Sequence, residues 1–176
     1  MSKFLIVVDM QKDFIDGSLG SAEARAIVPA AAKRIRDCRE AGYTVIATLD
    51  THGQDYMSTR EGVYLPVPHC VRDTEGWRLA PAIREALGDA LLVEKPTFGS
   101  VKLPEIIAAQ AAPDEKLTVE LIGLCTDICV VSNALLIKAH FPAADVQVSA
   151  ACCAGVTPAK HQAALETMAS CQIDIL

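Results

Sequence analysis

The chain has 176 residues, a length typical of one domain. Hydrophobic residues make up 51% and charged residues 22%, which excludes general disorder. The 16 lysines and arginines stand against 22 acidic residues, so the net charge is −6. This balance argues against nucleic acid or an anionic membrane as the main partner. We therefore expect a single domain over residues 1–176.

The cysteines and the start of the chain predict a cytoplasmic protein. The apolar run before Asp9 is too short for a signal-peptide core. No apolar run approaches the ~20 residues that a membrane-spanning helix needs. The seven cysteines are odd in number, and Cys152 and Cys153 are adjacent, a pattern unlike a secreted disulfide framework.

Strand and helix patterns alternate along the chain. Apolar, β-branched runs predict strands at residues 4–8, 43–49, 90–93, 117–123, 146–150 and 173–176. Helical patterns lie between them at residues 29–41, 81–87, 104–111, 126–141 and 158–170, the first beginning at Pro29 and ending before Gly42. Several strands are apolar on both faces, as in buried parallel sheets. We predict a three-layer, doubly wound α/β fold with helices on both faces of a six-stranded, mostly parallel sheet of order 3-2-1-4-5-6.

Two stretches have no clear periodicity, at residues 10–28 and 50–78. Long loops inside a compact domain are usually functional. Ligands of doubly wound sheets bind beyond the carboxyl ends of the strands, where these stretches begin. We therefore expect the functional side chains at the strand ends.

A thiol, a carboxylate and an amine follow three different strands. Cys129 lies at the predicted start of a helix, with Thr126 as the expected N-cap, where free N–H groups and the helix dipole favour a thiolate with a lowered pKa. The predicted strand order places Asp9 opposite this thiol, as a base. Lys95 would add positive charge. The residues alone also allow Cys129 to be a small core residue, so both interpretations stay open.

A second group has the composition of a metal site. Asp50 and His52 are two residues apart, so their side chains point the same way in an extended chain. His69 follows after a loop, and Glu61 is a candidate fourth ligand. Such a set suits zinc or a similar divalent ion. A turn aspartate beside surface histidines is the alternative interpretation.

Other motifs are missing or weak. No glycine-rich dinucleotide fingerprint follows the first strand, and no phosphate-binding loop is present. His140 and His161 lie on predicted helices without obvious partners, and we interpret both as structural.

Five segments together resemble the isochorismatase-like cysteine hydrolases, and among them the nicotinamidases. They are Val-Asp-Met-Gln-Lys-Asp-Phe at 8–14, Leu-Asp-Thr-His at 49–52, Pro-His-Cys-Val at 68–71, Lys-Pro-Thr-Phe at 95–98 and Gly-Leu-Cys-Thr-Asp-Ile-Cys-Val at 123–130. They occur in the order of the family and span nearly the whole chain. Thr-Asp-x-Cys-Val with an upstream Asp-x-Gln-x-Asp-Phe is a specific combination.

The resemblance implies a doubly wound fold and a catalytic triad of Asp9, Lys95 and Cys129. It implies an oxyanion hole formed by the backbone N–H groups of Cys125 and Cys129, with a cis peptide bond between Leu124 and Cys125. We also expect Phe14 and Leu124 to line the substrate pocket.

The resemblance further implies a metal site at Asp50, His52 and His69, with Zn²⁺ as the expected ion and Glu61 as the candidate fourth ligand. It also implies a homo-oligomer, either a dimer or a tetramer. The apolar composition of the chain points the same way.

Two departures from nicotinamidases leave the substrate open. Thr51 stands where an aromatic residue is common between the first two ligands, and residues 64–68 lack a tryptophan before the third ligand. The retained ligand types argue against the metal-free branches of the superfamily.

We therefore expect hydrolysis of a small, nicotinamide-like carboxamide to an acid and ammonia through a thioester. One alternative is another superfamily hydrolase, acting on an N-carbamoyl compound or on isochorismate. A second is a non-catalytic α/β module that binds a ligand or senses redox state, supported by Cys152 and Cys153 and the odd thiol count.

Overall fold

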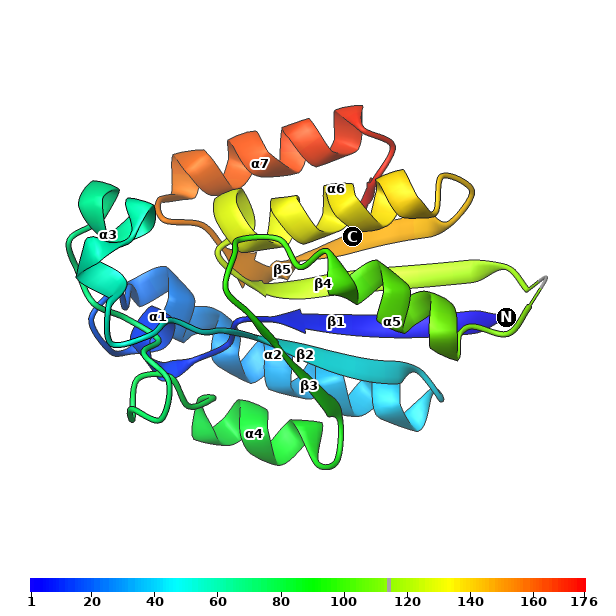
Figure 1. Ribbon diagram of the computed structural model, residues 1–176. Helices are drawn as coiled ribbons and strands as arrows, with labels where there is room; N and C mark the ends of the chain where they lie inside the picture. Colours follow the sequence, from blue (N-terminus) through cyan, green and yellow to red (C-terminus); the bar gives the residue numbers. More distant parts are fainter. Residues whose placement is uncertain (114) are drawn as a thin grey trace.

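The computed structural model describes residues 1–113 and 115–176 and has a six-stranded sheet of order β3-β2-β1-β4-β5-β6 at its centre (Figure 1). Every neighbouring pair of strands in it is parallel. The strands are β1 (Ser2–Val8), β2 (Thr44–Asp50), β3 (Leu91–Lys95), β4 (Leu117–Leu124), β5 (Asp145–Ala154) and β6 (Asp174–Ile175). The predicted fold class and strand order are confirmed.

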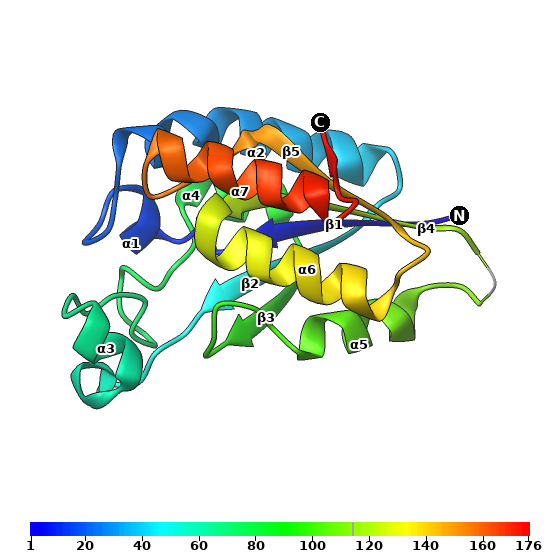
Figure 2. The ribbon, with the colours of Figure 1, turned by 90° about the horizontal axis from the view of Figure 1, so that it is seen from above.

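Helices cover both faces of the sheet, as Figure 2 shows. They are α1 (Lys12–Ile15), α2 (Ala22–Glu40), η1 (Tyr56–Ser58), α3 (Arg60–Tyr64), α4 (Pro81–Leu87), α5 (Lys102–Gln110), η2 (Thr126–Val130), α6 (Val131–His140) and α7 (Pro158–Ser170). Buried side chains of α2 and α4 share one core cluster, and those of α5, α6 and α7 share the other. Among the described residues, no helix is both long and apolar enough to cross a bilayer.

The two cores follow from the alternation of β1. Leu5 and Val7 point to the face under α2 and α4, whereas Phe4, Ile6 and Val8 point to the opposite face. All five side chains are buried, because the strand lies at the centre of the sheet. The central position of β1 therefore fixes the position of the residue that directly follows this strand.

The start of α2 corrects one prediction. Pro29 was expected to be the first helical residue, but α2 begins at Ala22 and contains Pro29 in its interior. The cap is Ser21, whose side chain accepts a hydrogen bond from the N–H of Ala24 at 3.0 Å. The predicted end is right, because Gly42 with φ of +78° follows the helix.

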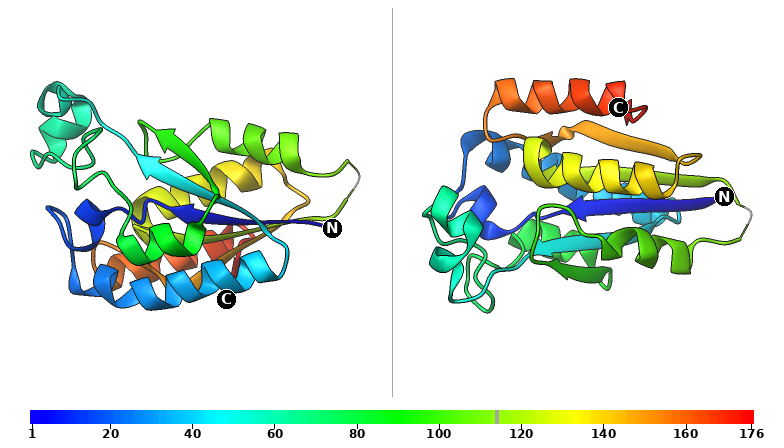
Figure 3. Two further views of the ribbon diagram at one scale, coloured as in Figure 1. Left: turned by 90° about the horizontal axis from the view of Figure 1, so that it is seen from below. Right: turned by 45° about the horizontal axis from the view of Figure 1, so that its top comes forward.

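The loops that follow the strands gather at one end of the sheet. There α1, η1 and α3 lie beyond the carboxyl ends of the strands, with the chain segment that leads to α4 (Figure 3). The stretch at 50–78, expected to be irregular, thus contains the short helices η1 and α3. The stretch at 10–28 contains α1 and the first turns of α2.

A partly buried ion pair joins α2 to the sheet and gives a stability prediction. Glu120 on β4 is fully buried, and Arg34 donates to both its carboxylate oxygens at 2.7 and 2.5 Å. Ser149 donates to the same carboxylate at 2.6 Å. Replacing Arg34 with methionine should lower the free energy of unfolding by about 3 kcal/mol, because it leaves a buried charge without its partner.

The control for this prediction is the adjacent residue of the same helix. Lys33 forms an exposed pair with Asp37 at 2.6 Å, so its change to methionine should cost about 0.5 kcal/mol or less. Urea denaturation followed by circular dichroism measures both variants. Equal losses in the two variants would contradict the role given to the pair between Arg34 and Glu120.

Candidate active site

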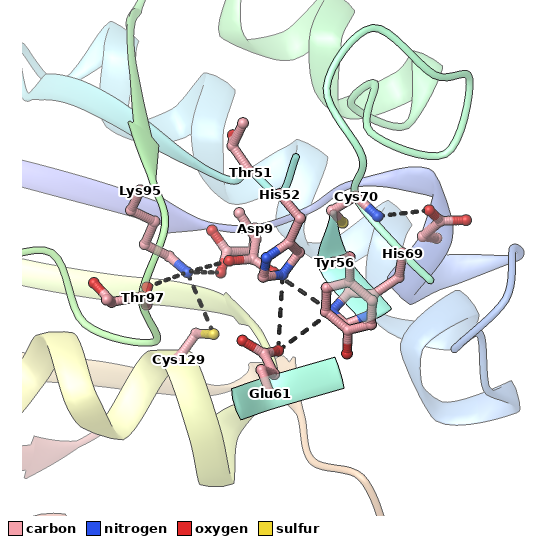
Figure 4. A network of polar contacts seen from close by, with 12 residues as sticks. Asp9, Thr51, His52, Tyr56, Glu61, His69, Cys70, Lys95, Thr97 and Cys129 are labelled. Carbon is pink, nitrogen blue, oxygen red and sulfur yellow. Dashed lines mark hydrogen bonds and ion pairs between the residues drawn. The ribbon is translucent and has the colours of Figure 1, made fainter. Parts of the chain in front are cut away.

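Three reactive side chains from three different segments meet at the carboxyl ends of the strands (Figure 4). Asp9 follows β1 directly, and Lys95 is the last residue of β3. The ammonium nitrogen of Lys95 lies 2.6 Å from Oδ2 of Asp9 and 3.4 Å from Sγ of Cys129. Thr48 donates a hydrogen bond to Oδ1 of Asp9 at 2.6 Å, which holds the carboxylate in place. The structure thus brings the three predicted triad residues together.

Burial sets the protonation of this group. It raises the pKa of Asp9, although the positive charge of Lys95 works against this rise. Burial and the negative charge of Asp9 raise the pKa of Cys129 well above its ordinary value. Burial alone would lower the pKa of Lys95. Asp9 and Cys129 raise this pKa by more than burial lowers it, so the amine stays charged.

The expectation that Cys129 has a lowered pKa and rests as a thiolate is therefore wrong. Its side chain is only 4% exposed and faces the carboxylate of Asp9, and both features raise the pKa of the thiol. The thiol needs a base before it can react. Asp9 is such a base, because a carboxylate with a raised pKa accepts a proton more readily.

The turn that carries the thiol is held from the side of α7. Thr126 is the first residue of η2 and not its N-cap, which is Cys125. The hydroxyl of Thr126 lies 2.7 Å from Nδ1 of His161, and the carboxylate of Asp127 accepts the N–H of Val156 at 2.9 Å. His161 is thus in contact with the turn that carries Cys129, and its structural role stays a prediction. This contact joins residues 35 positions apart, and no sequence pattern pointed to it.

The remaining residues of the predicted site have different surroundings. The peptide bond between Leu124 and Cys125 is cis, as the resemblance implied. Leu124 is buried in the core cluster on the side of α2. The ring of Phe14 is partly buried and its centroid lies 5.4 Å from that of His69. A role of Phe14 and Leu124 in the substrate pocket stays a prediction.

The four candidate metal ligands converge beside the triad (Figure 4). Asp50 ends β2, Glu61 comes from α3, and the ligand atoms of the whole group lie within 4.8 Å of one another. Oδ2 of Asp50 is 3.0 Å from Nε2 of His52 and 3.6 Å from Nε2 of His69. Oε1 of Glu61 is 3.7 and 3.6 Å from the same two nitrogens. The four residues that the sequence analysis predicted as metal ligands therefore lie together in the structure.

This group fits a divalent ion. Ligand atoms about 2.1 Å from a tetrahedral zinc ion are about 3.4 Å apart, close to the distances found here. Nδ1 of His69 lies 2.9 Å from the carbonyl oxygen of Val67, which leaves Nε2 for an ion. Burial lowers the pKa of His69, but Asp50 and Glu61 raise it more, to about 10. The carboxylates of Asp50 and Glu61 thus stabilise positive charge beside His69, as they would for a bound cation.

Two further buried side chains support the ligands. Gln11 donates to the carbonyl oxygens of Asp50 and Trp77 at 2.9 and 2.8 Å, and its own oxygen accepts the N–H of Asp50 at 2.7 Å. The ring of Tyr56 packs against both imidazoles, with centroid distances of 4.8 and 5.0 Å. Sequence reasoning assigned no role to either residue. The position of Gln11 inside the motif at 8–14 was the available signal.

Thr51, the departure noted between the first two ligands, has a specific partner. The indole N–H of Trp77 donates to Oγ1 of Thr51 at 2.9 Å. The hydroxyl of Thr51 in turn donates to the carbonyl oxygen of Leu49 at 3.0 Å. The indole of Trp77 therefore lies beside the loop that carries the ligands.

Fold and site together define a doubly wound α/β protein with a buried thiol, carboxylate and ammonium group beside a set of metal ligands. The family model of the isochorismatase domain matches residues 3–176. The chain belongs to the isochorismatase family.

Individual relatives agree with this assignment. A nicotinamidase/pyrazinamidase from Mycobacterium tuberculosis is 27% identical over 186 residues, which cover 98% of this chain and 97% of that protein. The crystal structure of a pyrazinamidase from Pyrococcus horikoshii in complex with zinc is 29% identical with a TM-score of 0.82, covering 100% of this chain and 99% of the other. A nicotinamidase structure from Bacillus subtilis, 24% identical, shares the fold with a TM-score of 0.85 over 99% of each chain. The expected similarity to nicotinamidases is confirmed, and the comparisons support a hydrolase of amide C–N bonds.

Proposed function

We propose that this protein is a metal-assisted cysteine amidohydrolase that converts a small, nicotinamide-like carboxamide into an acid and ammonia. The observation that carries the proposal is the contact of Lys95 with both Asp9 and Cys129, at 2.6 and 3.4 Å. We propose that residues 1–176 form one domain. We place it in the reducing cytoplasm, where its seven free cysteines would remain thiols.

The first half of the proposed reaction forms a thioester. The carboxylate of Asp9 takes the proton of the Cys129 thiol, and the thiolate attacks the amide carbon. The backbone N–H groups of Cys125 and Cys129 stabilise the oxyanion. The C–N bond then breaks as the carboxylic acid of Asp9 returns the proton to the departing nitrogen, which leaves as ammonia. Lys95 holds the carboxylate and offsets the negative charge that moves between carboxylate and sulfur.

The second half returns the enzyme to its starting state. Asp9, again a carboxylate, takes a proton from water, and the hydroxide attacks the thioester carbon. The C–S bond breaks, the acid product leaves, and the proton held by Asp9 returns to the thiolate of Cys129. Asp50, His52, Glu61 and His69 are the residues that would hold a divalent ion. Such an ion would supply a Lewis acid at this site.

A substrate panel tests this proposal. Purified protein is incubated with nicotinamide, other small carboxamides, N-carbamoyl compounds and isochorismate, and ammonia and acid products are measured. Release of ammonia and a carboxylic acid from a carboxamide supports it. Turnover of N-carbamoyl compounds or isochorismate alone would assign the chain to another branch of the superfamily. No turnover of any compound by metal-loaded protein would favour the non-catalytic alternative.

The metal site gives a second prediction. We expect about one divalent ion per chain, with zinc as the first candidate, measured by elemental analysis after reconstitution. The His52→Ala variant should lose most of this ion, whereas His140→Ala, far from the site, should keep it. The metal-free protein should remain folded by circular dichroism, because the two cores do not depend on the ion. Equal metal content in both variants would contradict the assigned ligands.

Assembly is a third prediction. We propose a homo-oligomer, a dimer or a tetramer, because large apolar side chains remain exposed on α3 and near α5. Val63 and Tyr64 are 71% and 75% exposed, and Val101 is 72% exposed. Light scattering at micromolar concentration measures the mass in solution. A mass equal to one chain would contradict the prediction.

A further inference from the structure

One buried polar residue that the mechanism does not use lies between the two reactive segments. Asn133 is on α6, four positions after Cys129, and its side chain is fully buried. Its Nδ2 donates to the carbonyl oxygen of Cys129 at 2.8 Å and to that of Phe98 at 3.3 Å. Its Oδ1 accepts the N–H of Ser100 at 2.9 Å. One side chain therefore binds the backbone of the thiol residue and the loop after β3.

That loop also fixes the amine. Lys95 donates to the carbonyl oxygen of Thr97 at 3.1 Å, and Thr97 directly precedes Phe98, the first loop residue that contacts Asn133. Gly99 lies directly against α6, since a Cβ atom there would be 2.6 Å from Cδ1 of Leu136 and 3.2 Å from Cβ of Ser132. The loop and α6 are therefore packed without room between them.

The chemistry of the side chain explains why this contact is specific. An asparagine amide in a helix interior lowers helix propensity, and burying it without partners costs free energy. Here both ends of the amide have backbone partners, so burial is compensated and the loop is fixed in one place relative to α6. An apolar side chain could fill this volume but could not fix the loop by hydrogen bonds.

We propose that Asn133 is a positioning residue that sets the separation of the Lys95 ammonium from the Cys129 thiol. The role follows from its contacts with the Cys129 carbonyl and with the loop that orients Lys95. It rests on the proposed function, because it assigns Asn133 to the same reaction. A displacement of about 1 Å in such a pair can cost up to ~100-fold in rate.

Two variants distinguish the effect of losing the hydrogen bonds from the effect of losing side-chain volume. Asn133→Ala and Asn133→Val both remove all three hydrogen bonds, but only alanine leaves a large cavity. Both should lower kcat at least tenfold, while KM for the amide changes less than about twofold. The control is Ser132→Ala, which removes a hydrogen bond to the carbonyl oxygen of Ile128 on the same helix and should keep kcat. A loss in the alanine variant alone, or a change in KM alone, would overturn the proposal.

Thiol reactivity gives a readout that does not depend on turnover. Iodoacetamide modification is followed by mass spectrometry, with the exposed Cys171 as internal reference and the buried Cys70 and Cys153 as reporters of unfolding. The ratio of modification at Cys129 to that at Cys171 should fall about tenfold in both Asn133 variants, with Cys70 and Cys153 still protected. An unchanged ratio would overturn the proposal. A purely structural role would instead expose all the buried thiols together.

A third variant acts from the other side of the contact and serves if the Asn133 variants do not fold. Gly99→Val pushes the loop away from α6 and leaves Asn133 in place. It should reproduce the loss in kcat and in the Cys129 ratio, and wild-type values would overturn the proposal. If the wild-type protein releases no ammonia from any amide, the proposed function fails. The modification ratio still decides whether Asn133 controls the thiol.

Discussion

Replacing Cys129 with alanine should reduce amide hydrolysis by at least about 10⁴-fold, because it removes the sulfur atom that forms the proposed thioester. The side chain is small and lies at the junction of η2 and α6, so the loss of one sulfur atom should leave the fold intact. Ammonia release at saturating amide measures the activity, and thermal unfolding measures the fold. Residual hydrolysis near the wild-type rate would exclude the thioester mechanism.

Two other buried cysteines are the matched controls. Cys152 and Cys153 lie on β5, and neither contacts Asp9 or Lys95 within the part of the chain that the structure describes. Cys152→Ala and Cys153→Ala should each keep most of the activity. The comparison also tests the redox alternative, in which these two thiols and not Cys129 would carry the function.

Replacing Asp9 with asparagine should lower kcat by 10²- to 10⁴-fold, about the usual contribution of a general base. Asparagine has nearly the same shape and can still accept the hydrogen bond from Thr48. It cannot take the thiol proton, and it leaves Lys95 without its partner at 2.6 Å. Asp37→Asn, at an exposed position on α2, is the control and should keep the wild-type rate.

The pH dependence of the wild-type enzyme tests the same assignment. The base works only as a carboxylate, so activity should fall as the pH drops through the pKa of Asp9. Burial raises that pKa above the ordinary value of 3.8, so the acid limb should lie at higher pH than for an exposed aspartate. The Asp9→Asn variant should lose this limb from its rate profile. An identical limb in the variant would assign it to another group.

The strand order could be predicted because short apolar runs alternate with helical patterns along the chain, which is typical of a doubly wound parallel sheet. Such runs mark residues 4–8 and 117–123, which form β1 and β4 at the centre of the sheet. The start of α2 could not be read in the same way, because Pro29 suits a first turn yet is tolerated inside this helix. The cap at Ser21 was the competing signal.

The site was predictable to the extent that its residues follow strands directly. Asp9, Asp50 and Lys95 are placed by strand ends alone, so the predicted sheet brought them together. The protonation of Cys129 was not predictable, because it depends on burial and on the exact approach of Asp9. Asn133 was not predictable either, because two of its three hydrogen-bond partners lie on a loop more than thirty positions away.

The hydrogen bond between Trp77 and Thr51 gives the protein an optical reporter of its own. The chain has a single tryptophan, so all indole fluorescence comes from one position. That indole donates to the residue between Asp50 and His52, and the carbonyl oxygen of Trp77 is bound by Gln11. Emission wavelength and quenching therefore report on the loop that carries the metal ligands, without a label and in the same cuvette as the activity assay.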